Sequence, residues 1–136
     1  MNSARIAPLL AGGVMGSTDS SFAVAEWQAD ASLPGPPQTI APLHLHHRDD
    51  EGWYVLEGKL CVQVGEEKVD VPAGSGVLVP KGTKHTYWNP DPVPARYLLF
   101  MTPRILGLIE ALHSLPDRNR ETVEALFAQF DSQLVD

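Results

Sequence analysis

Residues 42–58 read PLHLHHRDDEGWYVLEG, and this stretch combines three potential metal ligands with the start of the strongest strand signal in the chain. His44 and His46 are two residues apart, so in an extended segment both imidazoles leave the same face and can converge on one ion. Glu51 adds a carboxylate five residues after His46. The alternative is a polar loop in which the histidines occur by accident, and the rest of the chain has to decide between the two.

Short strand patterns follow this stretch at close spacing. Apolar residues alternate with others from Leu60 to Val64, and Gly and Pro residues punctuate the chain on either side, as is typical of hairpin-connected strands. Strands are expected at residues 21–27, 53–56, 60–64, 69–71, 77–79, 85–89 and 95–101. Because no helical pattern separates them, they predict an all-β fold, either an antiparallel sandwich or a small barrel.

The pattern changes to helical spacing at Pro103, which fits the first turn of a helix because its missing N–H would be unpaired there. Asp117 and Asn119 offer caps for a second helix. Apolar residues recur on one stripe of each segment: Ile105, Leu108, Ile109 and Leu112 in the first, and Val123, Leu126, Phe127, Phe130 and Leu134 in the second. We expect one or two C-terminal helices, at about 103–134, that cover the barrel or contact a second subunit.

Length and composition point to one folded domain spanning residues 1–136. Hydrophobic residues make up 43% and charged residues 20% of the chain, and the mean hydropathy of −0.11 predicts neither disorder nor membrane residence. Seventeen acidic residues against ten basic ones give a net charge of −7, and no run of Lys or Arg reverses that sign locally. Nucleic acid is therefore excluded as an expected partner.

The single cysteine, Cys61, excludes an intrachain disulfide framework and suits a reducing compartment. It lies in an alternating strand pattern, which predicts a packed thiol rather than a reactive one. The apolar run near the N-terminus is interrupted by Pro8 and Gly12, and no segment approaches the roughly 18–20 apolar residues needed to span a bilayer. We expect a cytoplasmic protein. Residues 1–19 fit either an edge strand or an arm on a neighbouring subunit.

A second stretch, GSGVLVPKGTKHTYWN, begins at Gly74 and ends at Asn89. Pro80 lies six residues after Gly74, and Gly82, His85 and Asn89 follow at intervals of two, three and four. This spacing, together with H-x-H-x4-E-x6-G in the first stretch, resembles the two conserved motifs of the cupin superfamily. Every position of the second motif matches.

The resemblance covers residues 40–101 closely and the flanks only in general layout. The first motif of the family usually opens with glycine, and Gln38 stands at that position here, which alters a loop position and no ligand. The resemblance implies a double-stranded β-helix, or jelly-roll barrel, that holds one metal ion through His44, His46, Glu51 and His85. Three imidazoles and one carboxylate suit divalent iron, manganese, nickel, copper or zinc, and the sequence does not choose among these ions.

The neighbouring polar residues are weaker candidates. Asp49 and Asp50 are alternative carboxylate ligands, but neither has the motif spacing. His47 should point away from the site, and His113 is expected to be an ordinary exposed histidine.

Strand alternation predicts which side chains line the pocket beside the metal. If Glu51 points inward, Trp53 and Val55 share its face, and if His85 points inward, Tyr87 and Asn89 share its face: the expected pocket lining is Trp53, Val55, Tyr87 and Asn89. Such apolar and aromatic walls suit a flat, weakly polar ligand better than a sugar, which needs many convergent hydrogen bonds.

The pattern from PLHLHH to HTYWNPDPVPARYLLFMTP, followed by C-terminal helices, is similar to the quercetinase-like single-domain group of cupins. That resemblance implies a dioxygenase acting on a small aromatic or enolic molecule, with Glu51 both ligating the ion and accepting a proton as the catalytic base. Cupins host many chemistries, so two alternatives stay open: a non-catalytic cupin that binds or senses a small molecule, and a metal-dependent isomerase or lyase.

The expected partner besides a small-molecule ligand is a second copy of the chain. Tyr54, Leu56 and Leu78 are predicted to face outward from their strands, and the edge strands of a small barrel need covering. A homodimer answers both needs, and single-domain cupins are commonly dimers.

Overall fold

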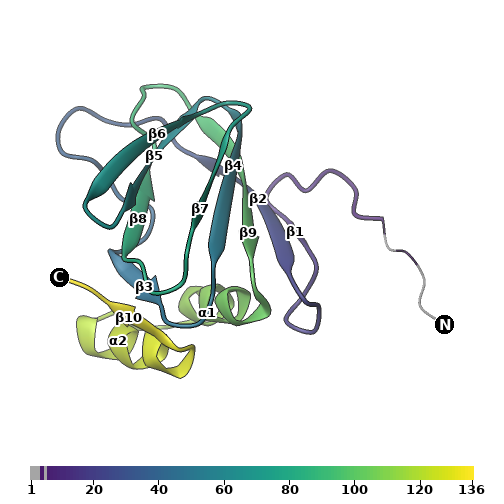
Figure 1. Ribbon diagram of the computed structural model, residues 1–136, viewed down its shortest axis with the longest axis vertical. Coiled ribbons are helices and arrows are strands. Elements are labelled where there is room, and N and C mark those ends of the chain that lie inside the picture. Colours follow the sequence, from purple (N-terminus) through teal and green to yellow (C-terminus); the bar gives the residue numbers. More distant parts are fainter. Residues whose placement is uncertain (1–3, 5) are drawn as a thin grey trace.

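The computed structural model describes residue 4 and residues 6–136, which form two antiparallel sheets of five strands each (Figure 1). The first sheet has the order β1 (Val14–Met15), β2 (Ala23–Ala29), β9 (Ala95–Met101), β4 (Glu51–Glu57), β7 (Gly76–Val79). The second sheet has the order β10 (Ser132–Leu134), β3 (His44–His46), β8 (His85–Trp88), β5 (Lys59–Val64), β6 (Glu67–Pro72). The predicted all-β jelly-roll architecture is confirmed.

The core lies between the two sheets and is built from the inward side of each alternating strand. In β4 the buried residues alternate with more exposed ones, so that Trp53 and Val55 point into the core while Tyr54 faces outward. Leu60 and Val62 from β5 and Tyr97 and Leu99 from β9 complete its centre and are at most 2% exposed. Alternation in the sequence therefore placed the interior correctly.

The N-terminal segment contributes an edge strand. Val14 and Met15 of β1 pair with Ala25 and Val24 of β2, so this part of residues 1–19 forms the expected edge strand. Residues 1–3 and 5 lie outside the described residues.

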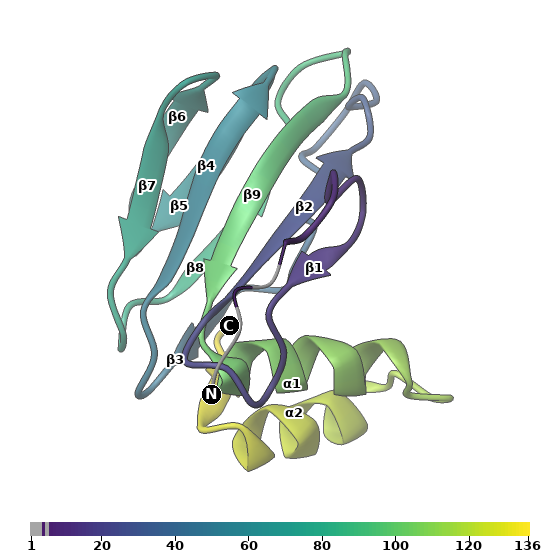
Figure 2. The same cartoon turned by 90° about the vertical axis from the view of Figure 1, so that its right-hand side faces the viewer.

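Two helices follow β9, and both cover one end of the sheets (Figure 2). Helix α1 (Pro103–His113) begins with proline at its first position, and the Thr102 side chain accepts a hydrogen bond from the Ile105 backbone N–H. Helix α2 (Arg120–Gln129) is capped by Asn119, as the sequence predicted. Within the described part of the chain, no helix is long and apolar enough to cross a membrane.

The second helix is shorter than predicted, and Leu134 is in a strand instead. The helix ends at Gln129, Asp131 takes a left-handed backbone conformation with φ of 51°, and Ser132–Leu134 form β10. β10 pairs with β3 in the register Ser132 to His46 and Leu134 to His44. The physical reason is that the free edge of β3 offers backbone hydrogen bonds that a continued helix could not use.

The single cysteine is packed as predicted. Cys61 lies in β5 and is 7% exposed. Burial raises the pKa of its thiol, and the neighbouring Asp70 adds to the rise. The thiolate, which is the reactive form, is therefore disfavoured.

Candidate metal centre

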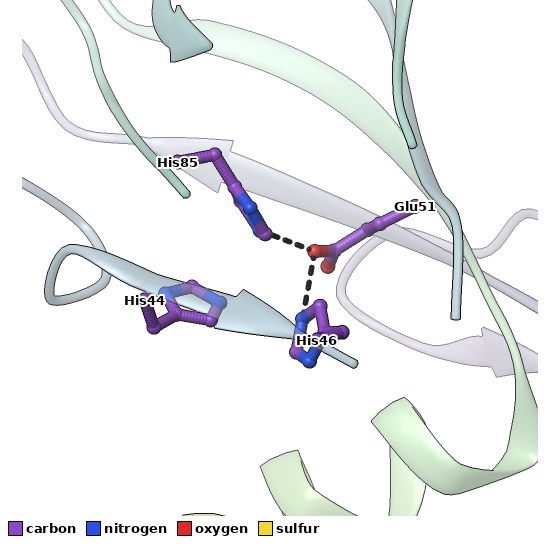
Figure 3. Close-up of side chains that lie close together, drawn as sticks. All are labelled: His44, His46, Glu51 and His85. Carbon is purple, nitrogen blue, oxygen red and sulfur yellow. Dashed lines mark hydrogen bonds and ion pairs between the residues drawn. The ribbon is translucent and has the colours of Figure 1, made fainter. Parts of the chain in front are cut away.

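Four buried side chains converge at the end of the barrel that the helices cover: His44, His46, Glu51 and His85 (Figure 3). One ligand atom from each lies within 4.8 Å of the others. His44 and His46 share a face of β3, and His44 is paired directly with His85 across the β3–β8 ladder. Glu51 begins β4 in the opposite sheet. The structure thus brings together all four predicted ligands, three from one sheet and one from the other.

The outward ring nitrogen of each histidine is held by an oxygen outside the cluster. His44 Nδ1 lies 2.6 Å from the Pro42 carbonyl oxygen, and His85 Nδ1 lies 3.0 Å from the Thr83 carbonyl oxygen. Because carbonyl oxygens only accept, both rings carry their proton on Nδ1. The lone pair is then on Nε2, which faces the cluster.

His46 follows the same rule through a side chain. Its Nδ1 lies 2.7 Å from the Ser132 hydroxyl oxygen, and that hydroxyl donates its own proton to the Phe130 carbonyl. The hydroxyl therefore accepts from His46 Nδ1–H and leaves His46 Nε2 as a lone pair. Such outer contacts fix the ring orientation of metal-binding histidines.

This arrangement fits a cation. The Nε2 atoms of His46 and His85 lie 3.2 and 2.9 Å from Glu51 Oε1. Two nitrogen lone pairs would then face a carboxylate oxygen, which is repulsive unless a proton or a metal ion lies between them. The four residues are compatible with one divalent transition-metal ion, for which imidazole and carboxylate are suitable ligands.

The pKa shifts describe the same site without metal. Burial lowers the pKa of His44 to about 4, with the nearby His85 contributing in the same direction. Burial alone would raise the pKa of Glu51, but the closely placed side chains of His46 and His85 outweigh it and lower that pKa to about 2. At neutral pH the cluster therefore offers a neutral His44 and an ionised Glu51, the protonation states that bind a metal.

The alternative carboxylates are engaged elsewhere. Asp49 is 7% exposed and accepts hydrogen bonds of 2.9 and 3.0 Å from Arg104 Nη1 at the start of α1. Asp50 Oδ1 accepts from the Lys81 backbone N–H at 2.8 Å. His47 and His113 are exposed, as expected. The two aspartates thus anchor the segment between His46 and Glu51 and are not part of the cluster.

A cavity of about 790 Å³ opens onto the cluster, a size in the range of small-molecule sites. His44, His46 and Glu51 form part of its wall. The helices supply much of the remaining lining, which is mainly apolar: Ile105, Leu108, Ile109 and Leu112 from α1, and Val123 and Phe127 from α2. The Phe127 ring lies 5.4 Å from the His44 ring, edge to face.

Of the four predicted lining residues, two line this cavity and two lie elsewhere. Trp53 and Tyr87 line this cavity. Val55 points inward but is fully buried in the core and is not in the cavity wall. Asn89 follows the last residue of β8, so alternation no longer applies; its amide donates to the Asp30 and Val93 carbonyl oxygens, and it lines a separate hollow of about 540 Å³.

Sequence reasoning missed Ser132, Tyr97 and the helical part of the cavity wall. Ser132 is separated from His46 by 86 residues, and no motif includes it. The helices were expected to cover the barrel, but helical spacing does not indicate which end they cover. Tyr97 lies in a correctly predicted strand. Its inward direction follows from its pairing with the inward-facing Val55 on the neighbouring strand β4, and the sequence did not predict that pairing.

A ligand cluster of this kind inside a two-sheet antiparallel barrel defines a class, the metal-binding double-stranded β-helix proteins. Residues 35–101 match the family described as "Cupin domain", and this range contains all four ligands. This match covers just under half of the chain, and together with the two-sheet fold it supports a place in the cupin superfamily.

Relatives by sequence cover only part of the chain. An uncharacterized protein of Methanocaldococcus jannaschii is 32% identical over 75 residues, which are 55% of this chain and 58% of that protein. The tetracenomycin polyketide synthase protein TcmJ of Streptomyces glaucescens is 33% identical over 60 residues, which are 44% of this chain and 40% of that protein. Each match spans less than two thirds of the relative.

Solved structures agree on the fold. A cupin protein from Bacteroides fragilis superposes with a TM-score of 0.61 at 15% identity, covering 88% of this chain and 93% of the other. A sugar phosphate isomerase from a cupin superfamily of Silicibacter pomeroyi superposes with a TM-score of 0.52 at 25% identity, covering 61% of this chain and 51% of the other.

Proposed function

We propose that this protein is a metal-dependent dioxygenase of the quercetinase-like group, acting on a small aromatic or enolic molecule. The observation that carries the proposal is the position of the four-ligand cluster in the wall of a mainly apolar cavity. Apolar and aromatic walls favour a flat molecule with few polar groups over a sugar. The similarity to TcmJ, named for polyketide synthesis, points in the same direction.

In this proposal each residue of the cluster has a role. His44, His46 and His85 hold the ion, which supplies Lewis-acid chemistry and, for a redox-active metal, electron transfer. Glu51 completes the ligand set and accepts a proton from the bound substrate at a carboxylate oxygen. The apolar residues of α1 and α2 orient the substrate and exclude water from the cavity.

Oxygen consumption tests the proposal. Protein loaded separately with iron, nickel and manganese is incubated with a panel of flavonols and diketones while dissolved oxygen is recorded. At least one loaded form should consume oxygen with one of these compounds. No uptake by any form excludes the dioxygenase, and tight binding of a panel compound without turnover supports a non-catalytic binding role instead.

A second candidate function is a metal-dependent isomerase of a phosphorylated substrate, and Arg118 favours it. Arg118 lines the cavity and makes no ion pair within the described part of the chain, whereas Arg120 is paired with Glu124 and Asp136. A free guanidinium suits a phosphate. The structural similarity to the Silicibacter pomeroyi sugar phosphate isomerase agrees with this candidate. Product formation under strictly anaerobic conditions would separate isomerase or lyase chemistry from oxygenation.

A cytoplasmic location is part of the proposal. It is supported by the single, buried thiol of Cys61, which is compatible with a reducing compartment. Fractionation of cells that produce the protein would test it.

A further inference from the structure

The cavity wall next to the metal cluster contains a buried hydrogen-bond donor without an acceptor. Among the described residues, Trp53 Nε1 is the one buried side-chain nitrogen or oxygen that has no hydrogen-bond partner. Trp53 is 2% exposed and lines the cavity, and its ring lies 5.7 Å from the His85 ring. An unpaired buried N–H costs stability, so such groups in native proteins call for an explanation.

Two tyrosine hydroxyls lie beside this indole. Tyr87 and Tyr97 both line the cavity, and their hydroxyl oxygens are 2.7 Å apart. The Trp53 and Tyr87 rings are 5.3 Å apart. One hydroxyl donates to the other, so the pair keeps one O–H for which the described residues provide no acceptor. The residues of this wall thus carry an indole N–H and one phenolic O–H at neighbouring positions.

These hydroxyls remain protonated at neutral pH. Burial raises the pKa of Tyr97 to about 12. Burial also raises the pKa of Tyr87 well above its usual value, with Tyr97 and Glu51 adding to the rise. Both tyrosines therefore act as donors, and their response to the Glu51 charge reflects their closeness to the metal cluster.

An indole N–H and a phenolic O–H at neighbouring positions favour a ligand oxygen with high electron density. We infer that Trp53, Tyr87 and Tyr97 form a subsite that binds a second oxygen of the metal-bound ligand, a carbonyl or enolate oxygen close to the oxygen held at the metal. The inference deepens the proposed function and rests on it, because it requires that the ligand binds at the metal cluster. It assigns a specificity-determining role to three residues outside the ligand set.

The test uses binding without turnover. Zinc-loaded protein with ¹⁵N-labelled indoles is titrated with acetylacetone, a stable molecule whose two carbonyl carbons are separated by one carbon. The indole N–H resonances are followed by NMR. Trp53→Phe assigns the Trp53 signal. This signal should move downfield on titration, because its proton gains an acceptor, while the Trp88 signal should not move, since Trp88 lies outside this cavity. The inference is overturned if the Trp53 signal has not moved when acetylacetone saturates the protein, or when its concentration has reached 10 mM.

Hydroxyl deletion gives an independent check. Tyr87→Phe and Tyr97→Phe keep the packed rings and should each weaken acetylacetone binding about tenfold with unchanged zinc content. Tyr54→Phe is the matched control, because the Tyr54 hydroxyl bonds to the Gly74 carbonyl away from the cavity. Wild-type affinity in both cavity variants overturns the subsite. Because zinc is not redox-active, a positive result combined with absent oxygen uptake would reject the dioxygenase while the subsite stands.

Discussion

At the scale of single residues, the cluster is defined by the outer contact of each histidine. Pro42, Thr83 and Ser132 each accept a hydrogen bond from an Nδ1 atom, so the Nε2 atoms of His46 and His85 are left to face Glu51 Oε1. The ligands are thus oriented before any metal binds. This preorganisation lowers the entropy cost of assembling the site and favours tight binding.

His85→Ala should reduce the metal content from about one ion per chain to nearly none. The variant removes one neutral imidazole from a buried cluster, and the three remaining ligands no longer form a full coordination shell around the ion. Elemental analysis of the purified variant measures this. His47→Ala is the control, because His47 is exposed and should leave the metal content unchanged. Full stoichiometry in His85→Ala would refute the ligand assignment.

Acidification should destabilise the metal-free protein between pH 7 and pH 5. The pKa of His44 is about 4 in the folded protein against 6.5 in the unfolded chain. Below neutral pH the unfolded chain therefore binds more protons than the folded protein, and the free energy of unfolding decreases as the pH is lowered. At pH 5 the loss from this residue is about 2 kcal/mol. The pKa of Glu51 is lowered to about 2, so protonation of Glu51 decreases the free energy of unfolding further only below about pH 4.5.

Urea unfolding of metal-free protein at pH 7, 6 and 5 measures this dependence. His44→Gln removes the titrating group and should flatten the profile over this range. A free energy of unfolding that is equal at pH 7 and pH 5 in the wild-type protein would contradict the low pKa of His44.

At the scale of elements, the C-terminal strand is the part that ties the helices to the metal centre. β10 pairs with β3 along the backbone of both ligand histidines, and its first residue, Ser132, holds the His46 ring. Helix α2 leads into β10, and α2 also places Phe127 against His44. The elements after residue 102, which are α1, α2 and β10, therefore supply contacts that surround the ligand histidines.

Ser132→Ala should weaken metal binding by about 10- to 100-fold without unfolding the protein. The methyl group cannot accept the proton of His46 Nδ1, so the ring loses its fixed orientation and its preferred tautomer. Competition with a chelator of known affinity measures the change. Ser132→Thr keeps the hydroxyl and should bind metal close to the wild-type level. Equal affinity in Ser132→Ala and wild type would show that the strand pairing alone positions His46.

The difference between predicted and observed elements has a physical origin. The strands from β4 to β9 and all four ligands could be predicted, because alternation, turn residues and motif spacing are local signals. Leu134 could not be placed, because its apolar spacing continues that of α2, and only the free edge of β3 pulls it into a strand. Asn89 failed as a lining residue for a related reason, since alternation gives no direction beyond the end of a strand.

At the scale of the whole molecule, the outer face of the first sheet carries exposed apolar side chains. The first sheet faces the viewer in Figure 2. Apolar residues on neighbouring strands of this sheet are exposed. Leu78 pairs with Gly52, and Gly52 pairs with Phe100. Leu78 is 63% and Phe100 42% exposed, and Tyr54 on the next row is 40% exposed. Exposed apolar residues that gather on one face of a sheet are typical of an interface.

We expect this face to form a homodimer, so that the protein in solution has about twice the mass of one 14.8 kDa chain. Leu78→Asp should convert it to a monomer, because the carboxylate would be buried against apolar side chains of the second copy without a partner. Size-exclusion chromatography with light scattering measures the mass. Leu33→Asp is the matched control, because Leu33 is 64% exposed in the loop before β3 and lies away from this face. A wild-type protein that elutes at 14.8 kDa would exclude the dimer and leave the apolar face without an assigned partner.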